Sequence, residues 1–117
     1  MEKITFEDFS HIMSSNRHKE HESGIEINFF VDDCIVYQDS WLGKMVNRYN
    51  QKDCYWFGLT YNGLQAYDYE SFDAFVDAKV FYGSKSLRDI WDSISFLSLG
   101  GGPVSEMLPC FIGNDDR

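Results

Sequence analysis

The pair Asn62-Gly63 lies between two aromatic-rich segments, and this arrangement predicts a β-hairpin. Asn-Gly is the preferred pair for a two-residue type I′ turn, because both positions of that turn need positive φ. Counting outwards from such a turn places Gly58 opposite Tyr67 and Trp56 opposite Tyr69. The hairpin therefore predicts aromatic cross-strand pairs and a ring that covers a strand glycine, both of which stabilise a sheet.

Shorter apolar runs predict the other strands. Residues 25–31 and 34–37 flank the pair Asp32-Asp33, which is typical of a hairpin with its turn at the two aspartates. Residues 95–99 predict a final strand, which the glycine run 100–102 ends. Strands joined in this way favour antiparallel pairing.

Apolar residues at helical spacing predict the helices, each behind a residue that suits an N-cap. The predicted helices cover residues 5–13, 40–50, 71–81 and 86–94, capped by Thr5, Ser40, Ser71 and Ser86. A further short helix is predicted to start at Pro103, because proline is tolerated in the first helical turn. The region of the second helix also carries the one basic cluster, Lys44, Arg48 and Lys52.

The expected fold is a single α+β domain over residues 1–117, with an antiparallel sheet of hairpins covered by several short helices. A chain of 117 residues has the commonest size for one domain. Its hydrophobic content of 44% is enough to bury a core without disulfides or metals. Aromatic residues make up 17% of the chain, so we expect some of them at a binding surface.

Charge excludes two classes of partner. The chain has 19 acidic and 10 basic residues, which gives a net charge of −9. Phosphate backbones and anionic membranes repel such a chain, so neither nucleic acid nor membrane is an expected partner. A basic protein is the natural partner, because opposite charge speeds association.

The cysteines and the N-terminus predict a cytoplasmic protein. Cys34, Cys54 and Cys110 are odd in number and widely spaced, which favours reduced thiols over a disulfide framework or a zinc ribbon. The first residues lack the basic start and apolar run of a signal peptide, and no stretch is long enough to span a membrane.

No motif predicts a catalytic residue, a cofactor or a metal site, so the chain is not expected to be an enzyme. His18 and His21 have a spacing that zinc can use, but they lack a third ligand, and a solvated loop is favoured. The glycine run 100–102 matches no phosphate-binding pattern. Pairs such as Asp32-Asp33 leave open a carboxylate-based enzyme, which would need two carboxyl groups facing each other in a cleft.

A candidate binding surface begins at the predicted hairpin. From Asp68 to Asp77 the chain carries several acids and no Lys or Arg, close to the hairpin aromatics. Aromatic anchors with carboxylates suit the capture of Arg and Lys side chains. The partner-binding candidates are Trp56, Tyr67, Asp68, Tyr69, Glu70, Asp73 and Asp77. The alternative is that the rings pack under a helix and the acids only solubilise the chain.

Residues 82–94 are similar to a stretch of barstar-like ribonuclease inhibitors, with Tyr82-Gly83, then Leu87 and Trp91-Asp92. The likeness covers about a tenth of the chain, includes one extra residue, and does not extend to the elements that follow. More broadly, the acidic, aromatic-rich chain without catalytic motifs resembles the immunity proteins of bacteriocin and contact-dependent growth inhibition systems. That resemblance implies a cytoplasmic inhibitor that binds a cognate toxin, often a nuclease.

Three hypotheses of function follow. The first is an inhibitor whose acidic, aromatic surface neutralises a basic toxin domain, probed by binding to that domain. The second is a structural or adaptor module that self-assembles, so a homo-oligomer is possible. The third is a small enzyme or ligand-binding domain, which predicts a deep pocket with converging polar groups.

Overall fold

Five antiparallel strands form one sheet in the order β4-β3-β2-β1-β5. The computed structural model describes residues 2–14, 24–46, 52–60 and 65–112. The strands are β1 (Ile25–Val31), β2 (Ser40–Val46), β3 (Asp53–Leu59), β4 (Gln65–Tyr69) and β5 (Ile94–Leu99). The helices are α1 (Phe6–Ser14), α2 (Phe72–Asp77) and α3 (Val104–Ile112), with 3-10 turns η2 (Ile35–Tyr37) and η4 (Trp91–Ser93).

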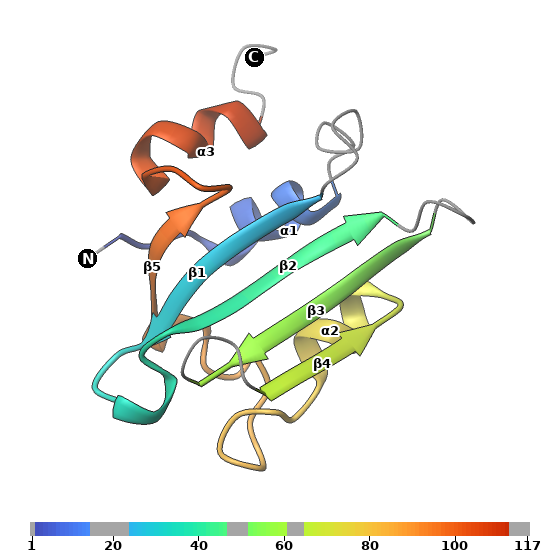
Figure 1. Cartoon of the computed structure of the whole chain (residues 1–117), viewed down its shortest axis with the longest axis vertical. Helices are drawn as coiled ribbons and strands as arrows, with labels where there is room; N and C mark the ends of the chain where they lie inside the picture. The colour runs from blue at the N-terminus through green and yellow to red at the C-terminus, as the bar shows by residue number, and fades with distance from the viewer. Residues whose placement is uncertain (1, 15–23, 47–51, 61–64, 113–117) are drawn as a thin grey trace.

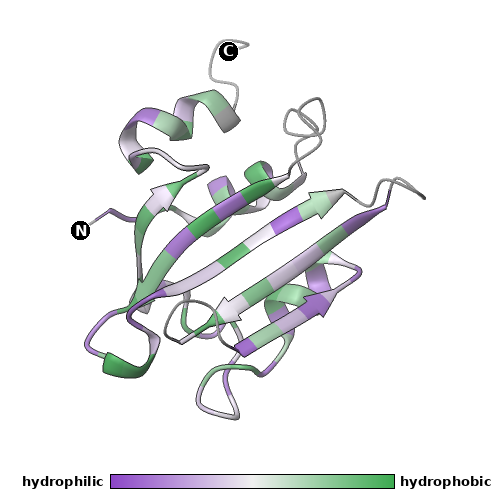
Figure 2. Ribbon diagram, in the orientation of Figure 1, coloured by the Kyte–Doolittle hydropathy of each residue, from purple (hydrophilic) through white to green (hydrophobic). Residues whose placement is uncertain are grey.

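Helices lie against one face of this sheet. Figure 1 shows α1 and α2 behind the strands, with α3 beside the end of β5. The alternation of side chains in β1 fits this arrangement, because every second residue from Ile25 to Val31 is buried and the residues between them are more exposed. Figure 2 shows hydrophobic and hydrophilic residues alternating along part of this strand. The chain is therefore one compact α+β domain with an antiparallel sheet, as the sequence predicted.

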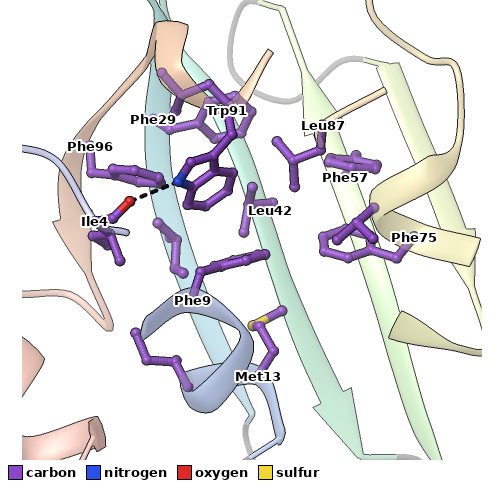
Figure 3. Packing of buried hydrophobic residues seen from close by; sticks show 14 of the residues in the cluster. Ile4, Phe9, Met13, Phe29, Leu42, Phe57, Phe75, Leu87, Trp91 and Phe96 are labelled. Carbon is purple, nitrogen blue, oxygen red and sulfur yellow. Dashed lines mark hydrogen bonds between the residues drawn. The ribbon is translucent and has the colours of Figure 1, made fainter. Parts of the chain in front are cut away.

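Aromatic rings fill the space between the sheet and the helices (Figure 3). The rings of Phe9 and Trp91 lie 4.7 Å apart between their centroids, and those of Phe57 and Phe75 lie 4.4 Å apart. The indole N–H of Trp91 donates a hydrogen bond of 2.9 Å to the carbonyl of Ile4, which satisfies its one polar atom. Much of the aromatic content thus belongs to the core.

Residues 40–46 form strand β2, so the predicted helix over residues 40–50 is wrong for the part that the structure describes. Leu42 faces the core as expected, but Lys44 is buried on the same face, while Met45 is half exposed. A buried lysine and an exposed methionine hide the alternation that identifies a strand. Of the expected basic cluster, Lys44 lies in the core and Lys52 at the surface, and Arg48 lies outside the described residues.

The turn at Asp32-Asp33 is confirmed, but its second strand was misplaced. The amide of Cys34 donates to the carbonyl of Val31 at 3.2 Å, and Asp33 has a φ of 57°. Residues 35–37 then form η2, and the strand that pairs with β1 is β2. The apolar run at 34–37 was therefore not a strand, because its apolar residues Ile35 and Val36 are exposed.

The hairpin of β3 and β4 exists, with a register one residue away from the prediction. Tyr67 lies opposite Phe57, and Tyr69 lies opposite Tyr55. The pair Asn62-Gly63 is outside the described residues. Thr60, at the end of β3, has a φ of 64°, so regular pairing ends before the position that a two-residue loop requires.

The helix caps behave largely as predicted. Thr5 accepts a hydrogen bond from the amide of Asp8 at the start of α1, and Ser71 accepts one from the amide of Ala74 at the start of α2. Ser86 and Asp89 form the two reciprocal bonds of a capping box, but a 3-10 turn follows where an α-helix was predicted. Strand β5 lies where the sequence placed it. Helix α3 starts at Val104, beside the predicted start at Pro103, but it continues past Leu108, where the predicted short helix ends, to Ile112.

Candidate functional site

The face of the sheet opposite α1 and α2, called the open face below, carries two rows of side chains across the strands. One row runs from Glu26 through Gly43 and Trp56 to Asp68. The neighbouring row runs from Asn28 through Trp41 and Gly58 to Ala66. Each tryptophan therefore pairs across the strands with a glycine.

The two glycines determine how the indole rings lie. A Cβ atom on Gly43 would stand 2.7 Å from Cζ2 of Trp56, so the Trp56 ring covers this backbone position closely. The same Cβ would stand 2.1 Å from the carbonyl oxygen of Ile25, so only glycine fits there. Gly58 has no side chain to fill the space beside Trp41. Each indole thus belongs to a cross-strand pair whose other member has no side chain.

A shallow pocket of about 360 Å³ lies between these rows and is open to solvent. Its lining residues come from strands β1 to β4: Glu26, Trp41, Trp56, Phe57, Gly58, Ala66 and Asp68. Both tryptophans are half-buried, and both carboxylates are exposed. The pocket thus combines two indole rings with two negative charges and no positive charge.

The ion pairs among the described residues do not include the two carboxylates of the pocket, Glu26 and Asp68. They join Lys3 to Asp32, Lys44 to Asp53, Lys79 to Asp89, and Arg88 to both Asp73 and Asp77. Within the same part of the chain, neither Glu26 nor Asp68 has a cationic partner. Within the described residues, the charge of these two carboxylates is thus not neutralised by an ion pair.

The structure separates the aromatic residues that the sequence grouped together. Trp56 and Asp68 are neighbours on the open face. Tyr69 lies on the opposite face, where its ring is 6.1 Å from that of Phe57. Burial, with the nearby Tyr67 and Asp68, raises the pKa of Tyr69. Tyr67 is at the sheet edge with 38% of its surface exposed. Tyr69 therefore follows the alternative given in the sequence analysis, in which an aromatic ring packs under a helix instead of forming part of a binding surface.

The acids that follow β4 form a second group, away from the pocket. Asp73 and Asp77 are on α2, and Arg88 lies against both, with Nε 2.8 Å from Oδ1 of Asp77. The Arg88 guanidinium also stacks over the ring of Phe6 at 5.0 Å. Glu70 is exposed between β4 and α2. Arg88 therefore neutralises part of the acidic segment.

Glu26 and Trp41 are site residues that the sequence analysis missed. The signal that could have found them is the run Trp41, Gly43 and Met45, whose alternate positions all face the open side. That signal depends on recognising residues 40–46 as a strand, and the helical spacing of the apolar residues obscured it.

The side chains of Cys34 and Tyr82 form a thiol–phenol contact in which the pKa of each group is shifted. Burial raises the pKa of the Cys34 thiol, but hydrogen bonds from Tyr82 and from the backbone of Val36 and Tyr37 lower it below its usual value overall. The same hydrogen bond to Cys34, followed by burial, raises the pKa of Tyr82 to about 12. No histidine of the described residues takes part in this contact.

The described residues contain no group of three or more His, Cys, Asp or Glu side chains placed to hold a metal ion. No helix in that part of the chain is long and apolar enough to cross a membrane. Comparison of the chain with protein families, with characterised proteins and with solved structures finds no match.

Proposed function

We propose that this protein is a non-enzymatic inhibitor that binds and neutralises a basic toxin domain, such as a nuclease, in the cytoplasm. The observation that carries the proposal is the open face, where Trp41 and Trp56 lie beside two carboxylates that have no cationic partner among the described residues. Tryptophan is among the commonest energetic anchors of protein interfaces. Unpaired carboxylates at the same place select a basic partner.

The size of the open face fits such an interface. Strands about 4.8 Å apart, with residues about 3.3 Å apart along them, give five strands of this length a face on the order of 500 Å². A standard interface buries about 800 Å² on each partner. The open face therefore supplies more than half of the area, and exposed acids at the rim, such as Glu70, supply more.

The net charge of −9 adds a long-range contribution. It draws a basic domain towards this protein and raises the association rate at low ionic strength. A nuclease suits this role, because a groove that binds phosphates is basic. Covering that groove would block the substrate without any chemistry by the inhibitor.

Calorimetric titration against the toxin-like domain encoded next to its gene tests the proposal. We expect binding at nanomolar strength together with loss of toxin activity. The open-face variant Glu26→Lys/Asp68→Lys should bind at least about tenfold more weakly. The reason is that removing one partner of a charge pair that is buried in the interface costs about 2 kcal/mol or more of binding free energy.

The matched control is Glu7→Lys/Asp92→Lys, which changes the net charge equally at exposed positions outside the open face. It should reduce the association rate slightly and leave the dissociation rate unchanged. Absence of binding at high micromolar concentration would reject this partner. Equal losses in both variants would reject the open face as the contact surface.

A further inference from the structure

We propose that the pocket between Trp41 and Trp56 is a subsite for one arginine side chain of the partner. This inference rests on the proposed function only for the source of the arginine. The pocket itself is defined by the pairing of β2 with β3. In that pairing Trp41 lies opposite Gly58, and Gly43 lies opposite Trp56. Its volume of about 360 Å³ is near the lower end of the ~300–1,000 Å³ typical of ligand sites.

The arrangement suits a flat cation. Trp56 is held against Gly43, and Gly58 places no side chain beside Trp41. The pocket lined by both rings is open to solvent, so a planar group can enter it. Guanidinium is planar and weakly hydrated, and it stacks on aromatic faces. An ammonium group is compact and strongly hydrated, so a lysine gains less from the same rings.

The carboxylates supply the second half of the recognition. Glu26 on β1 and Asp68 on β4 stand at the two ends of one row, with Trp56 inside it. A guanidinium that stacks on an indole keeps its N–H donors at its rim, where they can reach a carboxylate in the fork geometry. The backbones of Glu26 and Asp68 are three strand spacings, or about 14 Å, apart. The pocket therefore offers stacking and a charge-assisted hydrogen bond to one carboxylate, while the other carboxylate adds a longer-range attraction.

The chain already holds an arginine of its own in this way. Arg88 stacks on the Phe6 ring at 5.0 Å and meets the carboxylates of Asp73 and Asp77 at its nitrogen atoms. The pocket has the same components, an aromatic surface and two carboxylates, and none of its lining residues is a cation. The open face is therefore equipped for an arginine that the described part of the chain does not supply.

NMR titration with N-acetyl-Gly-Arg-Gly-amide tests the subsite without any toxin. The protein has three tryptophans, and therefore three indole N–H signals. We expect the signals of Trp41 and Trp56 to shift with a Kd of about 1–10 mM, because a single side chain buries little surface. The signal of Trp91, which is in the core and donates to Ile4, should not move and serves as the internal control.

The neutral isostere separates charge from stacking. The citrulline peptide has nearly the same shape as the arginine peptide without its charge, and we expect it to bind at least about fivefold more weakly. The lysine peptide should also be weaker. Equal shifts with the arginine and citrulline peptides, or shifts at Trp91 of the same size, would overturn the assignment.

Conservative variants locate the site. Glu26→Gln and Asp68→Asn should each weaken the arginine peptide about threefold or more, while both keep the shape of the pocket. Asp73→Asn, an exposed acid on α2, is the matched control and should leave the affinity unchanged. Full affinity in the Glu26→Gln/Asp68→Asn double variant would reject the subsite.

These outcomes are distinct from those for the proposed function. If the arginine peptide binds selectively and the toxin domain does not, the subsite stands and the inhibitor proposal fails. If the toxin domain binds with nanomolar affinity and no peptide shifts the Trp41 and Trp56 signals, the inhibitor proposal stands and the subsite fails.

Discussion

Lys44 has an unusual position for a lysine, because only 1% of its side chain is exposed. Its ammonium group donates to the carbonyl of Met13 at 2.5 Å, near the C-terminal end of α1, where the helix dipole favours a positive charge. Asp53 at the start of β3 lies 3.4 Å away, and the Tyr55 ring lies 5.8 Å away. Lys44 therefore links β2 to both α1 and β3.

We predict that Lys44→Met lowers the free energy of unfolding by about 1–2 kcal/mol and that Lys44→Ala lowers it by about 3 kcal/mol. Methionine fills the same space but loses the contacts with Met13 and Asp53, whereas alanine also leaves a cavity. The Asp53 side chain is 25% exposed, so water can replace part of its lost partner. Urea denaturation measures both values, and a Lys44→Met variant at least as stable as the wild type would show that the desolvation penalty dominates.

Lys44 also shows why residue-level patterns failed on this strand. Leu42 and Lys44 face the core, while Trp41 and Met45 face the open side, so polarity and burial disagree at these positions. Trp41 and Met45 thus place apolar residues on the face opposite Leu42, and the combined spacing of the apolar residues mimics that of a helix. The candidate Trp56 could be found because Asn62-Gly63 defined its hairpin, but Trp41 had no such signal.

The segment between α2 and β5 is an element whose local signals are correct and whose secondary structure still differs from the prediction. Asp89 accepts hydrogen bonds from the Ser86 amide at 3.0 Å and from the Lys79 ammonium at 3.1 Å. The Ser86 hydroxyl accepts one from the Asp89 amide. A capping box satisfies backbone groups at a turn whether or not a helix follows. Here Leu87 is buried from the turn before η4 and Trp91 is buried from η4 itself, so packing decides the outcome.

Asp89 makes the stability of this element depend on pH. The hydrogen bond from the Ser86 backbone, then those from Lys79 and the Ser86 side chain, lower the pKa of Asp89 to about 2 from 3.8. A lowered folded-state pKa gives stability that is present above pH 4 and is lost as the pH falls towards 2. We predict that Asp89→Asn lowers Tm at pH 7 and that the difference from the wild type disappears by pH 2.

Thermal unfolding of the wild type and Asp89→Asn across pH 2 to 7 checks this expectation. Asp92→Asn, at an exposed position in the same segment, is the control and should track the wild type throughout. A constant difference in Tm between the wild type and Asp89→Asn over that range would mean that the ionised carboxylate is not the source of the stability.

At the scale of the whole molecule, the alternation of strands and helices predicted the class of fold but not which face of the sheet is covered. That depends on β2, which brings Trp41 and Gly43 beside Trp56 and Gly58 from a different part of the chain. The register of the β3–β4 hairpin matters equally, since a shift of one residue moves Tyr67 and Tyr69 to the opposite face. The site could therefore be assembled only once four strands, β1 to β4, were in place.

An open face with two tryptophans could also serve self-assembly, which is the adaptor hypothesis. Electrostatics opposes it, because a face-to-face dimer would bring Glu26 and Asp68 of both copies together, and each copy has a net charge of −9. Like charges in a partly desolvated interface cost several kcal/mol. We predict a monomer of 13.6 kDa by light scattering at micromolar concentration and low salt.

Salt and charge removal test whether electrostatics is the reason for that state. At an ionic strength of 0.15 M, salt screens the repulsion between charges that are more than about 8 Å apart. Any association of the wild type should therefore increase with ionic strength. Glu26→Gln/Asp68→Asn should associate more readily than the wild type, because the tryptophans remain and the charges are removed. A wild-type dimer at low salt with the Trp41 and Trp56 indoles protected from solvent would instead make self-association the role of the open face, since it would hide the surface that a basic partner needs.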